Sequence, residues 1–398
     1  MRNVVIVDGI RTPFGRLGGG LRQFYPSELC GMTIRALAEK SGILERGGVD
    51  SVFMGSAAGD AHCTNLARYA VLYSGLPYET PASFVEMQCG SAIDALNHAA
   101  WKIMTGNADV IIAGGGESYS QRAAKFSMAT EPYRLIPPTA IPNTLSPKKE
   151  EAIDMVSIAN LMAERWNVSR EECDEFALRS QTLAKEAMDS GWLDDQIFPV
   201  KIPAAKRTPE AVVEKDEQPR ATTPEALAAL RPVKGSGVTT AGNSSGLNDG
   251  ASAVLLMSEE KAKELGYAPL AFWCGSAEYG VDPRYMGIAP AYSNLKLMDK
   301  IGLKTEDIAV WECNEAFAAQ NLSVIKETEE RTGSRIDRER WNPHGGAIAF
   351  GHPNGASGTR IVMYAMKHLA ENGGGYGLVS SCCGGGLGVS CLLDKIVP

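Results

Sequence analysis

The stretch Val85-Glu86-Met87-Gln88-Cys89-Gly90-Ser91-Ala92-Ile93 marks a change from an extended, β-branched segment to a helical pattern. From Ala92 onward, apolar residues recur at helical spacing, and Gly106 closes the run. Cys89 is therefore predicted at a helix N-terminus. Unpaired backbone N–H groups and the positive end of the helix dipole favour an anion there, so the sequence predicts a thiol with increased thiolate character. The alternative is a buried structural cysteine, because free cysteine is among the most buried residue types.

Length and composition limit the classes of protein to which this chain can belong. The chain has 398 residues, 44% hydrophobic residues and a net charge of -8, which predicts two or three domains and argues against general binding to nucleic acid or membrane surfaces. No apolar run is long enough to span a bilayer, and residues 3–8 read directly as a strand, so we expect a cytoplasmic protein. The nine cysteines lack zinc-site spacing, which predicts neither a disulfide framework nor a structural metal.

Strands and helices alternate in the first part of the chain. Strands are predicted at 3–8, 49–54 and 108–113, with helices at 27–40 and 61–74 between them. Such alternation predicts an α/β protein with a mostly parallel sheet covered on both faces.

The region 119–249 breaks this alternation. It contains a proline-rich loop, helical patterns at 155–165 and 170–190, and a charged stretch at 201–220. We interpret it as an insertion folded over the sheet, as a lid or ligand platform. The charged stretch is also typical of a solvated face.

The two ends of the chain repeat one pattern. Residues 91–116 read as helix, glycine-containing turn, apolar strand and glycine triplet, and residues 358–386 repeat that order. We therefore predict a first half formed by 1–118 and 250–269, the insertion 119–249, and a second half formed by 270–398. Corresponding loops of two such halves would meet at the carboxyl ends of the strands, where a site is expected.

His352 lies in a glycine-dense loop that leads into a helix. Glycines on both sides of Pro353 allow the backbone to approach one imidazole closely, which suits a catalytic site. A surface or capping histidine is the alternative.

Two further segments follow predicted strands. The sequence Cys382-Cys383-Gly384-Gly385-Gly386 could present backbone N–H groups to an oxyanion, or it could be a tight turn with two packed thiols. Asn314 and Glu315 follow the strand at 308–311 and could anchor a water or cap the next helix.

Together and in this order, these segments resemble the thiolase family over essentially the whole chain. The resemblance rests on Gln88-Cys89-Gly90-Ser91, Asn314-Glu315-Ala316-Phe317, Gly351-His352-Pro353 and Cys382-Cys383-Gly384-Gly385-Gly386. It implies the thiolase fold, with two βαβαβαββ halves in a layered α-β-α-β-α arrangement and an inserted loop domain. It also implies homodimers or homotetramers that use acyl-CoA and CoA, without a metal or redox cofactor.

The resemblance assigns roles to the site residues. Cys89 would be the nucleophile that becomes acylated, His352 would activate it, and Cys382 would move a proton to or from the α-carbon of the second acyl group. Asn314 would hold a water that joins His352 in one oxyanion hole. The backbone N–H groups of Cys89 and Gly384 would form the other.

The resemblance also assigns residues that bind the substrate, and it leaves open which of two adjacent cysteines carries the proton. The resemblance places Arg220 at the adenine end of coenzyme A, Ser245 at the pantetheine, and Met155 and Met286 in the substrate pocket. Because Cys383 lies next to Cys382, either thiol could take the proton role.

The implied activity is that of an acetyl-CoA C-acyltransferase of fatty acid metabolism. It condenses two acyl-CoA molecules reversibly to a 3-oxoacyl-CoA and CoA, with acetoacetyl-CoA as the product from acetyl-CoA. An acyl-cysteine intermediate splits the reaction into two half-steps, which predicts ping-pong kinetics. The alternatives are a decarboxylating condensing enzyme and a non-catalytic acyl-CoA-binding subunit. The first is disfavoured by Cys382 and the segment Asn314-Glu315-Ala316-Phe317, and the second by Cys89, His352 and Cys382.

Overall fold

A computed structural model describes residues 1–127, 131, 133–134, 136–204 and 209–395. Within these residues, no helix combines the length and the apolar character needed to cross a membrane.

The chain order of the elements is as follows. The first part contains β1 (Val4–Arg11), β2 (Gly15–Arg16), α1 (Pro26–Ser41), α2 (Ile43–Arg46), β3 (Ser51–Gly55), α3 (Leu66–Ser74), β4 (Ala82–Val85), η1 (Gln88–Gly90), α4 (Ser91–Met104), β5 (Val110–Ser118) and η2 (Tyr119–Gln121). The middle contains α5 (Met155–Arg165), α6 (Arg170–Asp189), β6 (Val200–Ile202), β7 (Ala211–Val213) and α7 (Pro224–Ala228). The remainder contains β8 (Asn248–Ser258), α8 (Glu259–Leu265), β9 (Ala271–Gly280), η3 (Pro283–Ile288), α9 (Ala289–Ile301), η4 (Thr305–Asp307), β10 (Ile308–Cys313), α10 (Ala318–Thr332), η5 (Arg338–Arg340), α11 (Ala347–Phe350), α12 (Asn354–Glu371), β11 (Gly375–Cys383) and β12 (Leu387–Lys395).

The large sheet has the strand order β10-β11-β12-β9-β1-β8-β5-β3-β4. Only the pairs β10–β11, β3–β4 and β3–β5 are parallel, while the other pairs along this order are antiparallel. The prediction of a mostly parallel sheet is therefore wrong. The reason is that β8 returns from the insertion and β12 follows β11 through a tight turn, so neither strand is reached through a crossover helix.

The two halves repeat the same pairing. The order β3-β5-β8-β1 matches β10-β11-β12-β9, with one parallel and two antiparallel pairs in each set. The β1–β9 pair joins the halves into one sheet. The second half departs from the βαβαβαββ order at one point, because its third strand is reduced to an isolated bridge between Trp311 and Trp341.

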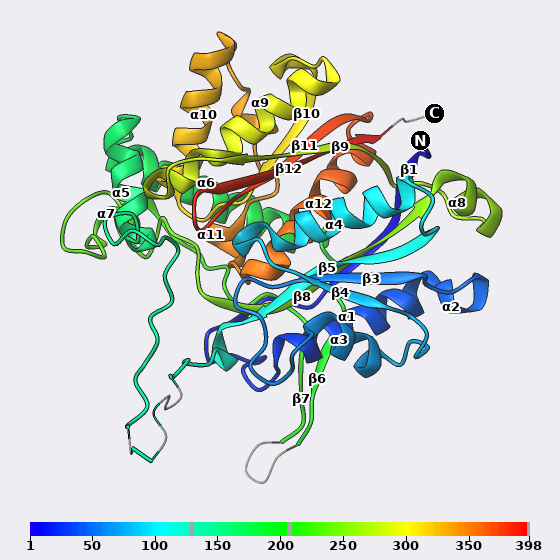
Figure 1. The fold of residues 1–398 in the computed structure, drawn as a ribbon. Helices are drawn as coiled ribbons and strands as arrows, with labels where there is room; N and C mark the ends of the chain where they lie inside the picture. Colours follow the sequence, from blue (N-terminus) through cyan, green and yellow to red (C-terminus); the bar gives the residue numbers. More distant parts are fainter. Residues whose placement is uncertain (128–130, 132, 135, 205–208, 396–398) are drawn as a thin grey trace.

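Helices form three layers around the strands (Figure 1). Helices α4 and α12 pack against each other between the two halves and contact strands of both. Helices α1 and α3 cover the outer face of the first half, and α9 and α10 lie on the outer side of the second. The layered α-β-α-β-α arrangement is thus confirmed.

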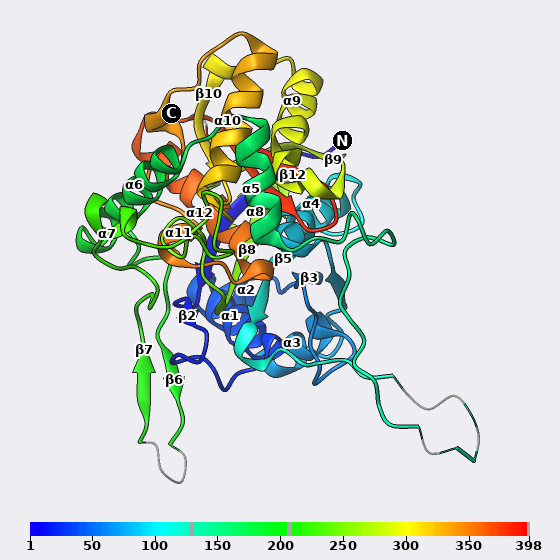
Figure 2. The same cartoon turned by 90° about the vertical axis from the view of Figure 1, so that its left-hand side faces the viewer.

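The middle segment packs on the second half. Helix α5 contacts η3 and α10, and α6 contacts α11, α10 and α7. The β6–β7 ribbon projects away from the body (Figure 2). Helix α3 begins at Leu66 rather than at 61, because the Asn65 side chain accepts a hydrogen bond from the Arg68 backbone N–H and caps the helix there.

A buried ion pair fastens the insertion to β1. The guanidinium of Arg11 donates two hydrogen bonds of 2.7 Å to the two carboxylate oxygens of Asp216, and neither side chain is exposed to solvent. Bidentate geometry of this kind fixes both position and orientation. Two segments 205 residues apart are therefore held together.

Candidate active site

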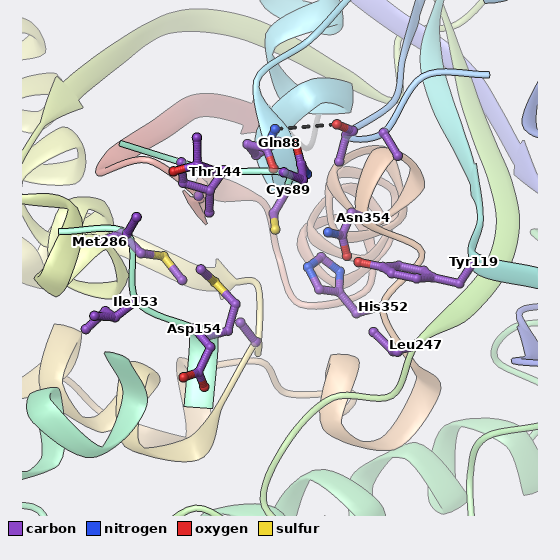
Figure 3. A pocket seen from close by; sticks show the side chains of 18 of the residues that line it. Gln88, Cys89, Tyr119, Thr144, Ile153, Asp154, Leu247, Met286, His352 and Asn354 are labelled. Carbon is purple, nitrogen blue, oxygen red and sulfur yellow. Dashed lines mark hydrogen bonds between the residues drawn. The ribbon is translucent and has the colours of Figure 1, made fainter. Parts of the chain in front are cut away.

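A cavity of about 820 Å³ opens at the carboxyl end of β4 and between the two halves. Its walls include Cys89, His352, Gly384, Ser245, Met155 and Met286 (Figure 3). Six of the predicted site residues thus meet in one place, although they come from segments distributed along nearly 300 residues of the chain.

A sharp turn presents Cys89 to this cavity. After β4, Gln88 adopts a left-handed backbone with φ of 47°, which non-glycine residues seldom adopt. The Ser91 hydroxyl locks the turn, since it accepts from the Met87 backbone N–H at 2.9 Å and donates to the Gln88 carbonyl at 2.6 Å. Helix α4 then starts at Ser91, so the predicted position of Cys89 at a helix N-terminus is confirmed.

The thiol of Cys89 is not a resting thiolate. Burial is the largest effect on its pKa and, together with the charge of Glu117, raises it to about 12. The backbone N–H groups of Cys89 and Gly384 lower the pKa, but they do not offset the burial. The expectation of increased thiolate character is therefore wrong for the free protein. The same two N–H groups are the donors that the family resemblance assigns to an oxyanion hole.

His352 is held as a neutral base. Its Nδ1 lies 2.6 Å from the Ser357 hydroxyl, and the Asn314 amide nitrogen donates to its Nε2 at 3.3 Å. Burial, with the charge of Arg360, lowers the pKa of His352 to about 3. This arrangement leaves Nε2 unprotonated, and the Cys89 sulfur points toward the imidazole (Figure 3).

The backbone of His352 is fixed by Asn248. The Asn248 Oδ1 accepts a hydrogen bond of 3.0 Å from the His352 backbone N–H. At the preceding Gly351, φ is 93° and a Cβ would lie 2.4 Å from the Asn248 amide group. Only glycine fits this position, which explains the glycine-dense loop seen in the sequence.

Strand alternation separates the two adjacent cysteines of β11. Cys382 packs in the apolar cluster that includes Met286 and Ala316 from the cavity wall. Cys383 packs on the other face, in the cluster between the halves, and its sulfur would contact a Cβ at Gly90 at 2.6 Å. Burial and the neighbouring Cys89 raise the pKa of both thiols, so this effect does not distinguish them. The packing against Met286 and Ala316 favours Cys382 over Cys383 as the second thiol of the site.

Three predicted residues, Asn314, Cys382 and Arg220, do not line the cavity. Asn314 is buried behind His352 and reaches the site only through the Nε2 contact. Arg220 is exposed, and its Nη2 donates to the Ala241 carbonyl at 2.9 Å, outside the cavity wall.

Glu117 is a buried carboxylate in the cavity wall that the sequence did not single out. Its buried carboxylate accepts hydrogen bonds from the backbone N–H groups of Ala57 (2.8 Å), Ala58 (3.3 Å) and Gly355 (3.1 Å). It thereby ties the end of β3, the end of β5 and the start of α12 together around Cys89. Its position directly after the glycine triplet at the end of a strand was the available signal.

Tyr119 was also missed. It lines the cavity close to Asn354, and burial raises its pKa (Figure 3).

Family models match nearly the whole chain. The model described as thiolase, N-terminal domain, matches residues 4–260, and the model described as thiolase, C-terminal domain, matches residues 267–395. This chain belongs to the thiolase family. Members of this family are acyltransferases, so this thiolase is an acyltransferase, as the resemblance predicted.

Named relatives of this thiolase cover its full length. A beta-ketoadipyl-CoA thiolase of Pseudomonas putida is 40% identical over 414 residues, with 100% of both chains covered. An acetyl-CoA acetyltransferase of Syntrophomonas wolfei is 37% identical, with 99% of this chain and 100% of the relative covered.

Solved structures agree with the fold. The acetyl-CoA acetyltransferase of Bacillus anthracis superposes with a TM-score of 0.91 at 39% identity, and the human mitochondrial 3-ketoacyl-CoA thiolase with 0.89 at 35% identity. Each comparison covers 99% of both chains. The thiolase fold is confirmed.

Proposed function

We propose that this thiolase cleaves and forms 3-oxoacyl-CoA through an acyl group carried on Cys89. The observation that carries the proposal is the meeting of Cys89, His352 and the Gly384 backbone at one cavity, with Asn314 and Cys382 directly behind it. Such a set supplies a nucleophile, a base, a second proton carrier and donors for an oxyanion, which are the groups that Claisen chemistry needs.

In the thiolysis direction, the Cys89 sulfur attacks the 3-oxo carbonyl, and His352 takes the thiol proton at Nε2. The bond between the second and third carbons then breaks. The acyl group remains on Cys89, and the acetyl-CoA enolate takes a proton at its α-carbon from the Cys382 thiol. Because Cys89 and His352 are both neutral at rest, attack and proton transfer occur together.

The second half-step returns every group to its starting state. The thiol of CoA gives its proton to the Cys382 thiolate, and the CoA sulfur attacks the acyl-Cys89 thioester. As the bond to Cys89 breaks, His352 returns its proton to that sulfur. Condensation of two acetyl-CoA molecules to acetoacetyl-CoA is the reverse sequence.

Several finer properties belong to the same proposal. The pantetheine of coenzyme A lies along the wall that holds Ser245, Met155 and Met286, and Arg220 meets the adenine end. The reaction needs no metal or redox cofactor, because thiols and an imidazole move all the protons. We also propose a cytoplasmic homodimer or homotetramer, and a role in acyl-CoA metabolism such as that of fatty acids. The proposal also keeps the predicted division of the chain into a first half (1–118 and 250–269), an insertion (119–249) and a second half (270–398).

Peptide-resolved mass spectrometry after brief exposure to acetoacetyl-CoA tests the function. We expect an acetyl adduct on Cys89, no adduct in Cys89→Ala, and release of acetyl-CoA when CoA is added. An adduct on another cysteine would overturn the assignment. Binding of CoA without thiolysis would support a non-catalytic subunit, and activity only with malonyl donors would support a decarboxylating condensing enzyme.

A further inference from the structure

A second cavity adjoins the first one at Gln88. It has a volume of about 570 Å³ and shares five lining residues with the cavity at Cys89, namely Ala57, Ala58, Gln88, Arg122 and Asn143. Gln88 and Arg122 therefore lie where the two cavities meet.

About half of the wall of the second cavity is apolar. Its apolar residues include Leu66, Phe84, Ala123, Ala124 and Ile141, which suit a short methylene chain.

The charged groups of this cavity are Asp60, Arg122 and Lys125. The Asp60 carboxylate accepts from the backbone N–H groups of Ser27 at 3.0 Å and His62 at 2.7 Å, so its oxygens are already used. Arg122 stacks over the Tyr119 ring with 5.5 Å between the guanidinium carbon and the ring centroid. Neither Arg122 nor Lys125 forms an ion pair with any residue that the structure describes, whereas Arg134 further along the same loop pairs with Glu131 at 2.8 Å.

The lining residues differ between the two cavities. Ser245, Met155 and Met286, where the proposed function places the pantetheine, line only the first cavity, whereas Gln88 and Arg122 line both. If CoA occupies the wall that holds Ser245, an acyl chain on Cys89 that extends past Gln88 is directed toward Arg122. This step rests on the proposed function.

We propose that Arg122, assisted by Lys125, binds a carboxylate at the far end of the acyl chain. The preferred substrates are then 3-oxoacyl-CoA thioesters of dicarboxylic acids, in which a short apolar chain separates the 3-oxo group from a terminal carboxylate. The planar guanidinium offers paired donors that match a carboxylate, and its stacking on Tyr119 holds it at the junction of the two cavities.

Two six-carbon substrates that differ only in the terminal carboxylate test this proposal. The thiolysis kcat/KM is measured for 3-oxoadipyl-CoA and for 3-oxohexanoyl-CoA in the wild type, Arg122→Gln, Lys125→Gln and the double variant. We expect the wild type to prefer 3-oxoadipyl-CoA and the ratio of the two constants to fall about tenfold or more in Arg122→Gln, as befits one charge-assisted hydrogen bond. The double variant should lower the ratio further. Arg134→Gln, on the same loop but on neither cavity wall, is the matched control and should keep the wild-type ratio.

The failure of this proposal differs from failure of the proposed function. A wild type that thiolyses acetoacetyl-CoA but favours 3-oxohexanoyl-CoA, or an Arg122→Gln ratio equal to that of the wild type, would overturn the carboxylate site and leave the thiolase reaction standing. A wild type that thiolyses neither acetoacetyl-CoA nor 3-oxoadipyl-CoA and forms no Cys89 adduct would overturn both.

Discussion

The Nε2 atom of His352 lies 3.3 Å from the amide nitrogen of Asn314. Asn314 follows β10, and His352 lies in the loop before α12, so the contact forms only when these two segments of the second half pack together. The amide donates to the nitrogen that faces Cys89, and the other ring nitrogen is held by Ser357. The contact therefore fixes both the orientation and the protonated nitrogen of the imidazole.

Replacement of Asn314 by alanine removes this donor. We expect kcat to fall on the order of a hundredfold or more, the usual effect of losing one donor near an oxyanion, with little change in the unfolding midpoint. Steady-state thiolysis and thermal unfolding measured on the same preparation check this. A variant that loses its folded structure together with its activity would contradict a purely local role.

The two adjacent cysteines should behave differently, because strand β11 turns them to opposite faces. Cys382→Ser should abolish exchange of the α-protons of acetyl-CoA with deuterated water but still form the acyl adduct on Cys89. Cys383→Ala is the matched control and should keep the exchange. Proton NMR of acetyl-CoA follows the exchange directly. Equal loss in both variants would show that the proton role is shared.

The reactivity of Cys89 should depend on pH as expected for a protonated thiol. Because burial raises its pKa to about 12, the thiolate fraction grows about tenfold per pH unit between pH 7 and 10. Alkylation of the Cys89 peptide by iodoacetamide, followed by mass spectrometry, should rise over this range without a plateau. A plateau near neutral pH would instead indicate a thiolate–imidazolium pair.

His352 should not lose its basic form at mildly acidic pH. Its pKa is lowered to about 3, so the imidazole is neutral from pH 8 to pH 5, whereas an unshifted histidine would become protonated near pH 6.5. We expect no step near pH 6.5 in kcat/KM that belongs to this residue. A decrease in kcat/KM toward acidic pH with a midpoint near 6.5 would contradict the prediction if it were unchanged in His344→Gln and His368→Gln.

Gly346 allows a buried carboxylate to sit beside the site. A Cβ at this position would lie 2.1 Å from the carboxyl carbon of Glu315, which accepts hydrogen bonds from Ser180 at 2.6 Å and Asn342 at 2.9 Å. Gly346→Ala should lower the free energy of unfolding by about 1–3 kcal/mol through overpacking and should reduce activity. Gly280→Ala, where a Cβ meets no atom within 4 Å, is the control. Urea unfolding of both variants measures the difference, and equal stabilities would contradict the prediction.

Much of the fold and the site could be predicted from the sequence, because short-range patterns carry that information. The helix start after Cys89, the repeat of 91–116 at 358–386, and the glycines around His352 each depend on residues that are close in the chain. The sheet pairing could not be predicted in the same way. Strands β1, β8, β9 and β12 meet partners that are distant in sequence, and spacing alone does not give their direction.

The sequence by itself determined the family, the order of the catalytic motifs and the position of Cys89 at a helix N-terminus. Only the tertiary structure decided that Cys382 packs against Met286 and Ala316 of the cavity wall, that burial raises the pKa of the Cys89 thiol, and that Arg220 lies outside the cavity wall. The physical reason is that burial and facing direction depend on every segment packed around a side chain. Those segments come from both halves and the insertion, and no local sequence pattern predicts which of them will contact one another.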